Sequence, residues 1–92
     1  MTSYIGLIDG KAGAYFPDLP GCTAMGATID KAVANAADAM RDWVDATEKK
    51  GDKVPAPRAL ESLSADDDAA EMLREGALVV RVPLVRAIGR PI

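Results

Sequence analysis

The order of apolar and polar positions predicts that the chain begins with short strands and continues into a helix. Residues 3–8 (SYIGLI) form a compact apolar segment, and the following residues, DGKAG, contain an Asp-Gly pair typical of a hairpin loop. We expect a strand over Ser3–Ile8, a short returning strand at Ala14–Phe16 and a third short strand at Cys22–Gly26. The beginning of the chain therefore predicts an antiparallel meander.

From Thr28 the apolar residues recur every three or four positions, which is the period of an amphipathic helix. Thr28 is a favourable N-cap, Asp30 places a negative charge in the first turn, and Gly51 is a natural residue to follow the helix. The pattern predicts a helix from Thr28 to Lys50. Its apolar stripe comprises Ile29, Val33, Ala36, Met40, Trp43, Val44 and Thr47.

The last part of the chain predicts an extended connection, a short helix and a strand. Residues Gly51–Arg58 (GDKVPAPR) carry two prolines, and Ser64 is a suitable N-cap for a second helix that runs to Glu75. Ala77–Val85 is continuous and β-branched, with Pro83 favouring a sheet edge or a strand end. The order β-β-β-α-(α)-β indicates an α+β fold, with an antiparallel sheet and one main helix packed on one of its faces.

Composition narrows the class of protein. Ninety-two residues allow one small domain, and a hydrophobic fraction of 49% excludes a disordered chain. Eleven basic and fourteen acidic side chains give a formal charge of −3, which argues against a general nucleic-acid binder. The acidic balance suits a basic protein partner, although it is equally the ordinary charge of a soluble protein.

The chain shows no targeting or membrane signal. The N-terminus, MTSYIGLIDGK, lacks a basic segment and a long apolar core, and no run approaches the ~20 apolar residues of a membrane span. We therefore expect a cytoplasmic protein with no membrane partner. Cys22, the single cysteine, cannot form an intramolecular disulfide, and we interpret it as a small core residue.

No set of residues forms a convincing catalytic or metal site. The chain has no histidine, and Asp66–Asp68 with Glu71 lacks the spacing of a calcium loop, so these acids are better explained by the dipole of a helix N-terminus. Asp9, Asp18 and Asp30 could in principle converge as a nuclease cluster, but each occupies a turn or cap position that explains it locally. We expect no enzymatic activity, no cofactor and no metal.

One longer combination of residues is more specific. FPDLPGC at Phe16–Cys22 is followed by Gly26-Ala27-Thr28, by the helix sequence IDKAVANAADAMRDWV and by the segment Pro55–Pro57. Over residues 3–85 this order resembles the N-terminal domain of HicB-type antitoxins. The resemblance implies a partial ribonuclease-H-like fold without the catalytic carboxylates of the nuclease. It also implies that the chain binds a small, basic, mRNA-cleaving HicA-type toxin and covers its active site.

The resemblance also predicts how the chain is organised. Residues 1–85 would be the toxin-binding domain, and residues 86–92 a tail or truncated linker toward a missing ribbon-helix-helix module. Many members of the family use such a module to repress their own operon, so we predict no DNA binding by this chain alone. Family members commonly self-associate, and a homo-oligomer is expected. As an alternative function, the chain is a structural module that self-associates through an exposed edge strand at Ala77–Val85.

Candidate binding residues lie on the proline turn and on the helix. In Pro17–Gly21, each of the two prolines fixes its own φ at about −65° and Gly21 can take a positive φ, so the turn can present a surface without a ligand. Trp43 is either a core residue or an interface anchor. An acidic helix face could meet the toxin's cationic surface, or it is simply solvated. The predicted toxin-binding residues are Asp18, Leu19, Pro20, Asp38, Asp42, Trp43 and Asp45.

Overall fold

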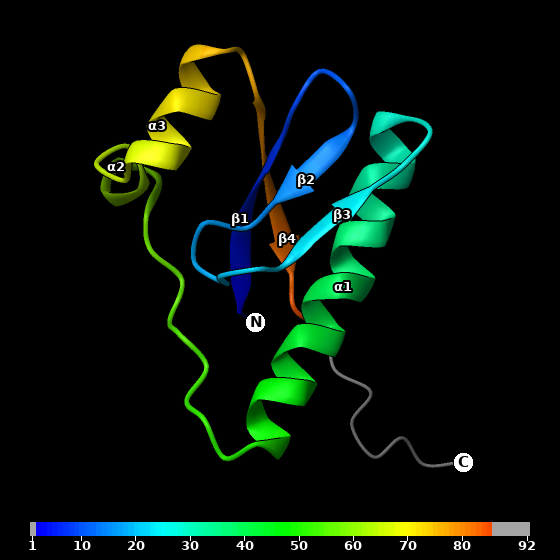
Figure 1. The fold of residues 1–92 in the computed structure, drawn as a ribbon, viewed down its shortest axis with the longest axis vertical. Helices are drawn as coiled ribbons and strands as arrows, with labels where there is room; N and C mark the ends of the chain where they lie inside the picture. Colours follow the sequence, from blue (N-terminus) through cyan, green and yellow to red (C-terminus); the bar gives the residue numbers. More distant parts are fainter. Residues whose placement is uncertain (1, 86–92) are drawn as a thin grey trace.

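The fold is a four-stranded antiparallel sheet with helices on both faces, as the computed structural model of the chain shows for residues 2–85 (Figure 1). The strands lie in the order β3-β2-β1-β4. This arrangement confirms the predicted α+β class and the antiparallel sheet; the tail predicted over residues 86–92 lies outside the described residues. The elements are β1 Ser3–Ile8, β2 Gly13–Tyr15, β3 Thr23–Met25, α1 Ile29–Lys49, α2 Leu60–Leu63, α3 Asp67–Arg74 and β4 Leu78–Pro83.

Strand β1 lies at the centre of the fold, and both of its faces are buried. Tyr4 and Ile8 belong to the core cluster that includes α1, whereas Ile5 and Leu7 belong to the cluster that includes α2 and α3. In Figure 1 the sheet accordingly lies between α1 on the right and the two short helices on the left. The continuous apolar run of β1 is typical of a strand that is covered on both sides. The sequence predicted α1 on one face, and the structure adds α2 and α3 on the other.

The four strands fall where the sequence placed them, with small shifts at their ends. β2 begins one residue before the predicted Ala14–Phe16, and β3 is shorter than the predicted Cys22–Gly26. β4 pairs with β1 from Ser3↔Pro83 to Ile8↔Leu78 and lies at the edge of the sheet, with Pro83 as its last residue. A proline is tolerated there because the described sheet has no further strand beyond β4 that would need the missing N–H as a donor.

Helix α1 begins and ends as predicted. Thr28 Oγ1 accepts a hydrogen bond from the Lys31 N–H at 3.1 Å, and Gly51 follows the helix with φ of 81°. The predicted stripe is wrong for Ile29, which is 37% exposed. Small alanines let the helix approach the sheet closely, so the buried line begins at Ala32, which the predicted stripe omitted, and continues through the predicted Ala36. The buried residues are Ala32, Ala36, Met40, Val44 and Thr47.

The second helical region differs from its prediction. Ser64 is not an N-cap but ends the short helix α2, which the sequence did not predict. Asp66 is the N-cap of α3, and its side chain accepts the Ala69 N–H at 3.1 Å. Leu63 is fully buried against β1, so one helical turn is used to bury it before the chain starts α3. Aspartate and serine are similarly good caps, and the packing of Leu63 decided between them.

Gly26, in the Gly-Ala-Thr motif, lies against the backbone of the first turn of α1. A Cβ at this position would be 2.4 Å from the Ala32 nitrogen and 2.7 Å from the Lys31 carbonyl carbon. The adjoining backbone is fixed on both sides, because the Gly26 N–H donates to the Ala12 oxygen and the Asn35 side chain donates to the Met25 oxygen at 2.7 Å. A side chain at residue 26 therefore requires β3 and α1 to move apart.

We predict that Gly26→Ala destabilises the fold by about 1–3 kcal/mol, because overpacking against backbone atoms cannot be relieved by a side-chain rotation. Gly10→Ala is the matched control, since a Cβ at Gly10 would meet nothing within 4 Å. Urea unfolding followed by far-ultraviolet circular dichroism measures both variants. Equal midpoints for the two variants would contradict the prediction.

Candidate interaction surface

The proline segment forms two consecutive turns, as the sequence predicted. The Leu19 N–H donates to the Phe16 oxygen at 3.1 Å, and the Cys22 N–H donates to the Leu19 oxygen at 2.9 Å. Each turn has a proline at its second position, where φ near −65° is required, and Gly21 has the positive φ of 83° that the second turn needs. Residues 16–22, called the double turn below, are consequently held by their own backbone hydrogen bonds.

Asp18 is buried and binds within the protein. Its carboxylate accepts the Arg58 backbone N–H at 2.7 Å and the Arg58 Nε–H at 2.5 Å, and only 4% of its side chain is exposed. The hydrogen bond with this carboxylate raises the pKa of the Arg58 guanidinium. Arg58 Nη2 also lies 3.7 Å from Asp66 Oδ2. Asp18 therefore joins the double turn to the segment that leads into α2.

Two of the predicted contact residues are not on the surface of this structure. Leu19 is fully buried in the core, and Asp18 is only 7% exposed with both carboxylate oxygens engaged by Arg58. Their side chains shape the turn from inside. Pro20 is exposed and is the member of the predicted set that this turn offers to solvent.

Trp43 is partly buried, so it shares features of the core residue and of the exposed interface anchor that the sequence left open as alternatives. Its ring packs against the core cluster of α1 while part of it stays exposed. Its Nε1–H donates to the Pro20 oxygen at 3.0 Å. The indole thus fastens α1 to the double turn, and the structure brings together two predicted site residues that are 23 positions apart.

A shallow groove runs between the double turn and α1. It encloses about 390 Å³, and Trp43 and Asp42 line its α1 side together with Ala39. Gly21, Cys22 and Thr23 line its other side. Burial raises the pKa of the Cys22 thiol to about 11, so this sulfur stays protonated near neutral pH and supplies no thiolate. The predicted role of Cys22 as a small buried residue is confirmed.

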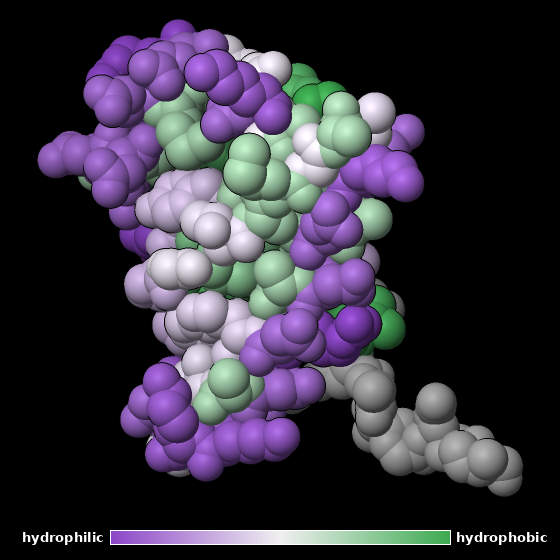
Figure 2. Space-filling model, turned by 45° about the vertical axis from the view of Figure 1, so that its right-hand side comes forward, coloured by the Kyte–Doolittle hydropathy of each residue, from purple (hydrophilic) through white to green (hydrophobic). Residues whose placement is uncertain are grey.

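The acidic residues of α1 share one side of the helix because they are spaced by four and three positions. Asp38, Asp42 and Asp45 are all exposed. Asp38 forms an ion pair with Arg41 at 3.0 Å, an exposed pair of small energetic value. Asp42 has no hydrogen bond or ion pair with any residue from 2 to 85. In Figure 2, weakly polar and weakly apolar residues occupy the middle of the face turned forward, and hydrophilic residues lie above, below and to the right of them.

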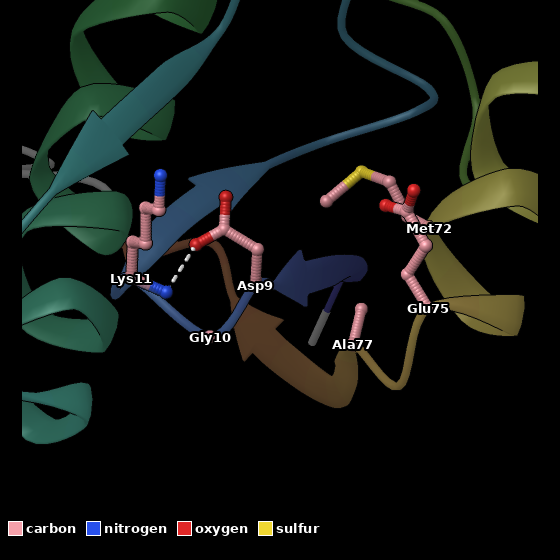
Figure 3. A pocket seen from close by; sticks show the side chains of 6 residues that line it. All are labelled: Asp9, Gly10, Lys11, Met72, Glu75 and Ala77. Carbon is pink, nitrogen blue, oxygen red and sulfur yellow. Dashed lines mark hydrogen bonds between the residues drawn. The ribbon is translucent and has the colours of Figure 1, made fainter.

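A second hollow, of about 360 Å³, lies between the hairpin loop and the end of α3 (Figure 3). Asp9 and Lys11 line it from the loop, Met72 lines it from α3, and Glu75 lines it from the position just after α3. Asp9 Oδ1 accepts the backbone N–H groups of Gly13 at 2.9 Å and Lys11 at 2.8 Å, and these bonds lower the pKa of the carboxyl. Asp9 thus closes the hairpin loop, as its position in the sequence indicated.

The described residues offer no metal site. Nowhere in residues 2–85 do three histidine, cysteine, aspartate or glutamate side chains gather closely enough to hold a metal ion. Asp9 closes the hairpin loop, Asp18 binds Arg58, and Asp30 lies in the first turn of α1. The hypothetical nuclease cluster of these three acids is therefore not assembled. None of the helices in the same residues is long and apolar enough to cross a membrane.

Sequence reasoning missed two residues that build this surface. Arg58 binds Asp18 from 40 positions away, and no sequence pattern links these two residues to each other. Ala39 leaves the space that becomes the groove, yet it is one alanine among many in α1. The proline segment following α1 is the signal that could have directed attention to Arg58.

We predict that Asp18→Ala destabilises the fold by about 2–3 kcal/mol, because two charge-assisted hydrogen bonds are lost at a buried site. Arg58→Ala should cost less, since the residue 58 backbone N–H still donates to the carboxylate. Arg41→Ala, which removes the exposed pair with Asp38, is the control and should leave stability almost unchanged. Chemical unfolding of the three variants gives the order, and an Asp18→Ala midpoint equal to that of Arg41→Ala would refute it.

Comparison with known proteins places the chain in a family. The family model of the HicB-like antitoxin of bacterial toxin–antitoxin systems matches residues 7–87. No curated protein sequence matches the chain. Among solved structures, the N-terminal domain of the Burkholderia pseudomallei antitoxin HicB is similar with a TM-score of 0.74 and 26% identity, over 91% of this chain and 99% of that one.

Two further structures agree. The Burkholderia pseudomallei antitoxin HicB has a TM-score of 0.68 and 30% identity; the similarity covers 90% of this chain but 63% of that one. A chain of the HicA3 and HicB3 toxin–antitoxin complex has a TM-score of 0.69 and 26% identity, over 89% of this chain and 96% of that one. Because the family model covers most of the sequence, this chain belongs to the HicB-like antitoxin family of bacterial toxin–antitoxin systems.

Proposed function

We propose that this chain is an antitoxin that binds a HicA-type toxin and inhibits it by covering its mRNA-cleaving site. The observation that carries the proposal is the similarity, over 89% of this chain, to a chain of the HicA3 and HicB3 complex. Membership of the HicB-like antitoxin family supports the same partner. The toxin acts on mRNA, so the expected place of action is the cytoplasm.

The surface built by the double turn and α1 suits recognition of a basic protein. The backbone hydrogen bonds of the double turn and the Trp43–Pro20 bond hold it in one shape, so little conformational entropy would be lost on binding. Asp38, Asp42 and Asp45 make one side of α1 acidic, and the formal charge is −3. Complementary charge accelerates association with a basic toxin. We propose Pro20, Trp43 and these acids as contact residues, with Asp18 and Leu19 holding the turn behind them.

We propose inhibition by occlusion, without a reaction catalysed by the antitoxin. The carboxylates of Asp9 and Asp18 accept hydrogen bonds from within the chain, and the Cys22 thiol is protonated near neutral pH. We assign no DNA binding to this chain alone, because a formal charge of −3 does not favour contact with phosphates. Repression of an operon remains a property that the resemblance implies for longer relatives.

The proposal predicts that the purified chain forms a complex with its HicA-type toxin and suppresses RNA cleavage in proportion to the amount added. Inhibition should reach its limit at a fixed molar ratio, as expected for occlusion. Denaturing the complex and refolding the separated toxin should restore cleavage. An unrelated acidic protein of similar charge is the control. Undiminished cleavage together with the absence of a complex on gel filtration would reject the proposed function.

We also propose self-association of this chain through β4, as an alternative or additional role. Within residues 2–85, β4 pairs only with β1 and its outer edge has no strand partner, and Leu78 and Val79 are 50% and 44% exposed. A second copy fits this edge because two β4 strands can pair antiparallel around a two-fold axis. With the axis between Val79 and Val80, Arg81 lies opposite Leu78 of the second copy, so that no like charges meet.

This model predicts a concentration-dependent dimer that Val79→Lys converts to a monomer. Met25→Lys is the matched control, because Met25 is 71% exposed on β3, at the other edge of the sheet. Light scattering coupled to gel filtration measures the mass of each variant. A monomeric unmodified chain at high concentration, or equal dissociation by Met25→Lys, would count against pairing through β4.

A further inference from the structure

The groove between the double turn and α1 combines an aromatic wall with one charged group. Trp43 forms part of the wall, and its Nε1–H is already committed to the Pro20 oxygen. The indole is therefore fixed in place, and what it can still offer a ligand is its π surface. Asp42, the adjacent residue of α1, is the single charged side chain in the lining.

Asp42 differs from Asp18 and Asp38 in having no counter-charge within residues 2–85. Asp18 is engaged by Arg58, and Asp38 by Arg41. Asp42 forms no hydrogen bond or ion pair with residues 2–85, and the remaining lining is neutral: Gly21, Cys22, Thr23 and Ala39. Ala39 lies one helical turn before Asp42 and Trp43, and its small side chain leaves the volume of about 390 Å³ open.

From this geometry we propose that the groove accepts an arginine side chain of the bound toxin. The inference rests on the proposed function and identifies where a basic partner inserts a cation. A guanidinium can stack on the indole face while its N–H groups donate to the Asp42 carboxylate, and both interactions strengthen as the groove loses water. A lysine ammonium has no plane to stack and cannot donate in a fork, which favours arginine.

The test uses the complex of this chain with a catalytically inactive HicA-type toxin, with affinity measured by isothermal titration calorimetry. Asp42→Asn should weaken binding about tenfold, as the loss of a charge-assisted hydrogen bond does. Asp67→Asn is its matched control: it removes the same charge from α3, on the opposite face of the sheet, and should leave affinity nearly unchanged.

A second pair of variants tests the shape of the groove without altering its charge. Ala39→Leu should fill the groove and weaken binding at least as much as Asp42→Asn, while leucine remains favourable in a helix. Ala34→Leu places the same side chain at an exposed position of α1 outside the groove and should have no effect. Circular dichroism of the free variants confirms that each one folds.

Substituting the toxin's arginines one at a time by lysine identifies the inserted residue. One such substitution should weaken binding to the unmodified chain, yet have little further effect on binding to the Asp42→Asn chain. Unchanged affinity of Asp42→Asn and Ala39→Leu, or equal losses with their controls, would overturn the groove while the proposed antitoxin function stands. A toxin that neither binds nor is inhibited by the unmodified chain would reject both.

Discussion

The fold depends on one buried carboxylate that holds together three separate parts of the chain. Asp18 fixes the double turn to the backbone and side chain of Arg58, and Arg58 in turn approaches the N-cap of α3 at Asp66. A carboxylate withdrawn from water requires charged or N–H donors, so the irregular segment after α1 must return to this point. The Tyr4 hydroxyl, donating to the Pro55 oxygen, attaches the same segment to β1.

This constraint explains why α2 and α3 can cover the second face of β1. The segment between α1 and α2 has no regular secondary structure over residues 52–59, and in Figure 1 it crosses from one side of the sheet to the other. Anchored by Asp18 and Tyr4, it delivers Leu63 and Ala69 onto Ile5 and Leu7. A domain of this size buries a small core, so a second covering layer contributes a substantial part of the apolar burial.

The same turn links stability to recognition. On its inner side it supplies Leu19 to the core and Asp18 to Arg58. On its outer side the Pro20 oxygen accepts the Trp43 Nε1–H, and Gly21 lines the groove. A surface supported in this way is pre-organised, which is the property that a binding protein without chemistry of its own requires. The proposed toxin contacts therefore lie on residues whose positions are set by the hydrophobic core.

The sequence by itself determined the strands, α1 with its Thr28 cap, the rigid double turn and the family, because each depends on local periodicity or backbone chemistry. Only the tertiary structure decided that Asp18 faces inward, that α3 starts after Asp66 and that Trp43 bonds to Pro20. These outcomes join residues 23 or 40 positions apart, or depend on burying Leu63. Local sequence patterns do not indicate such distant partners, because packing around a common core brings the partners together.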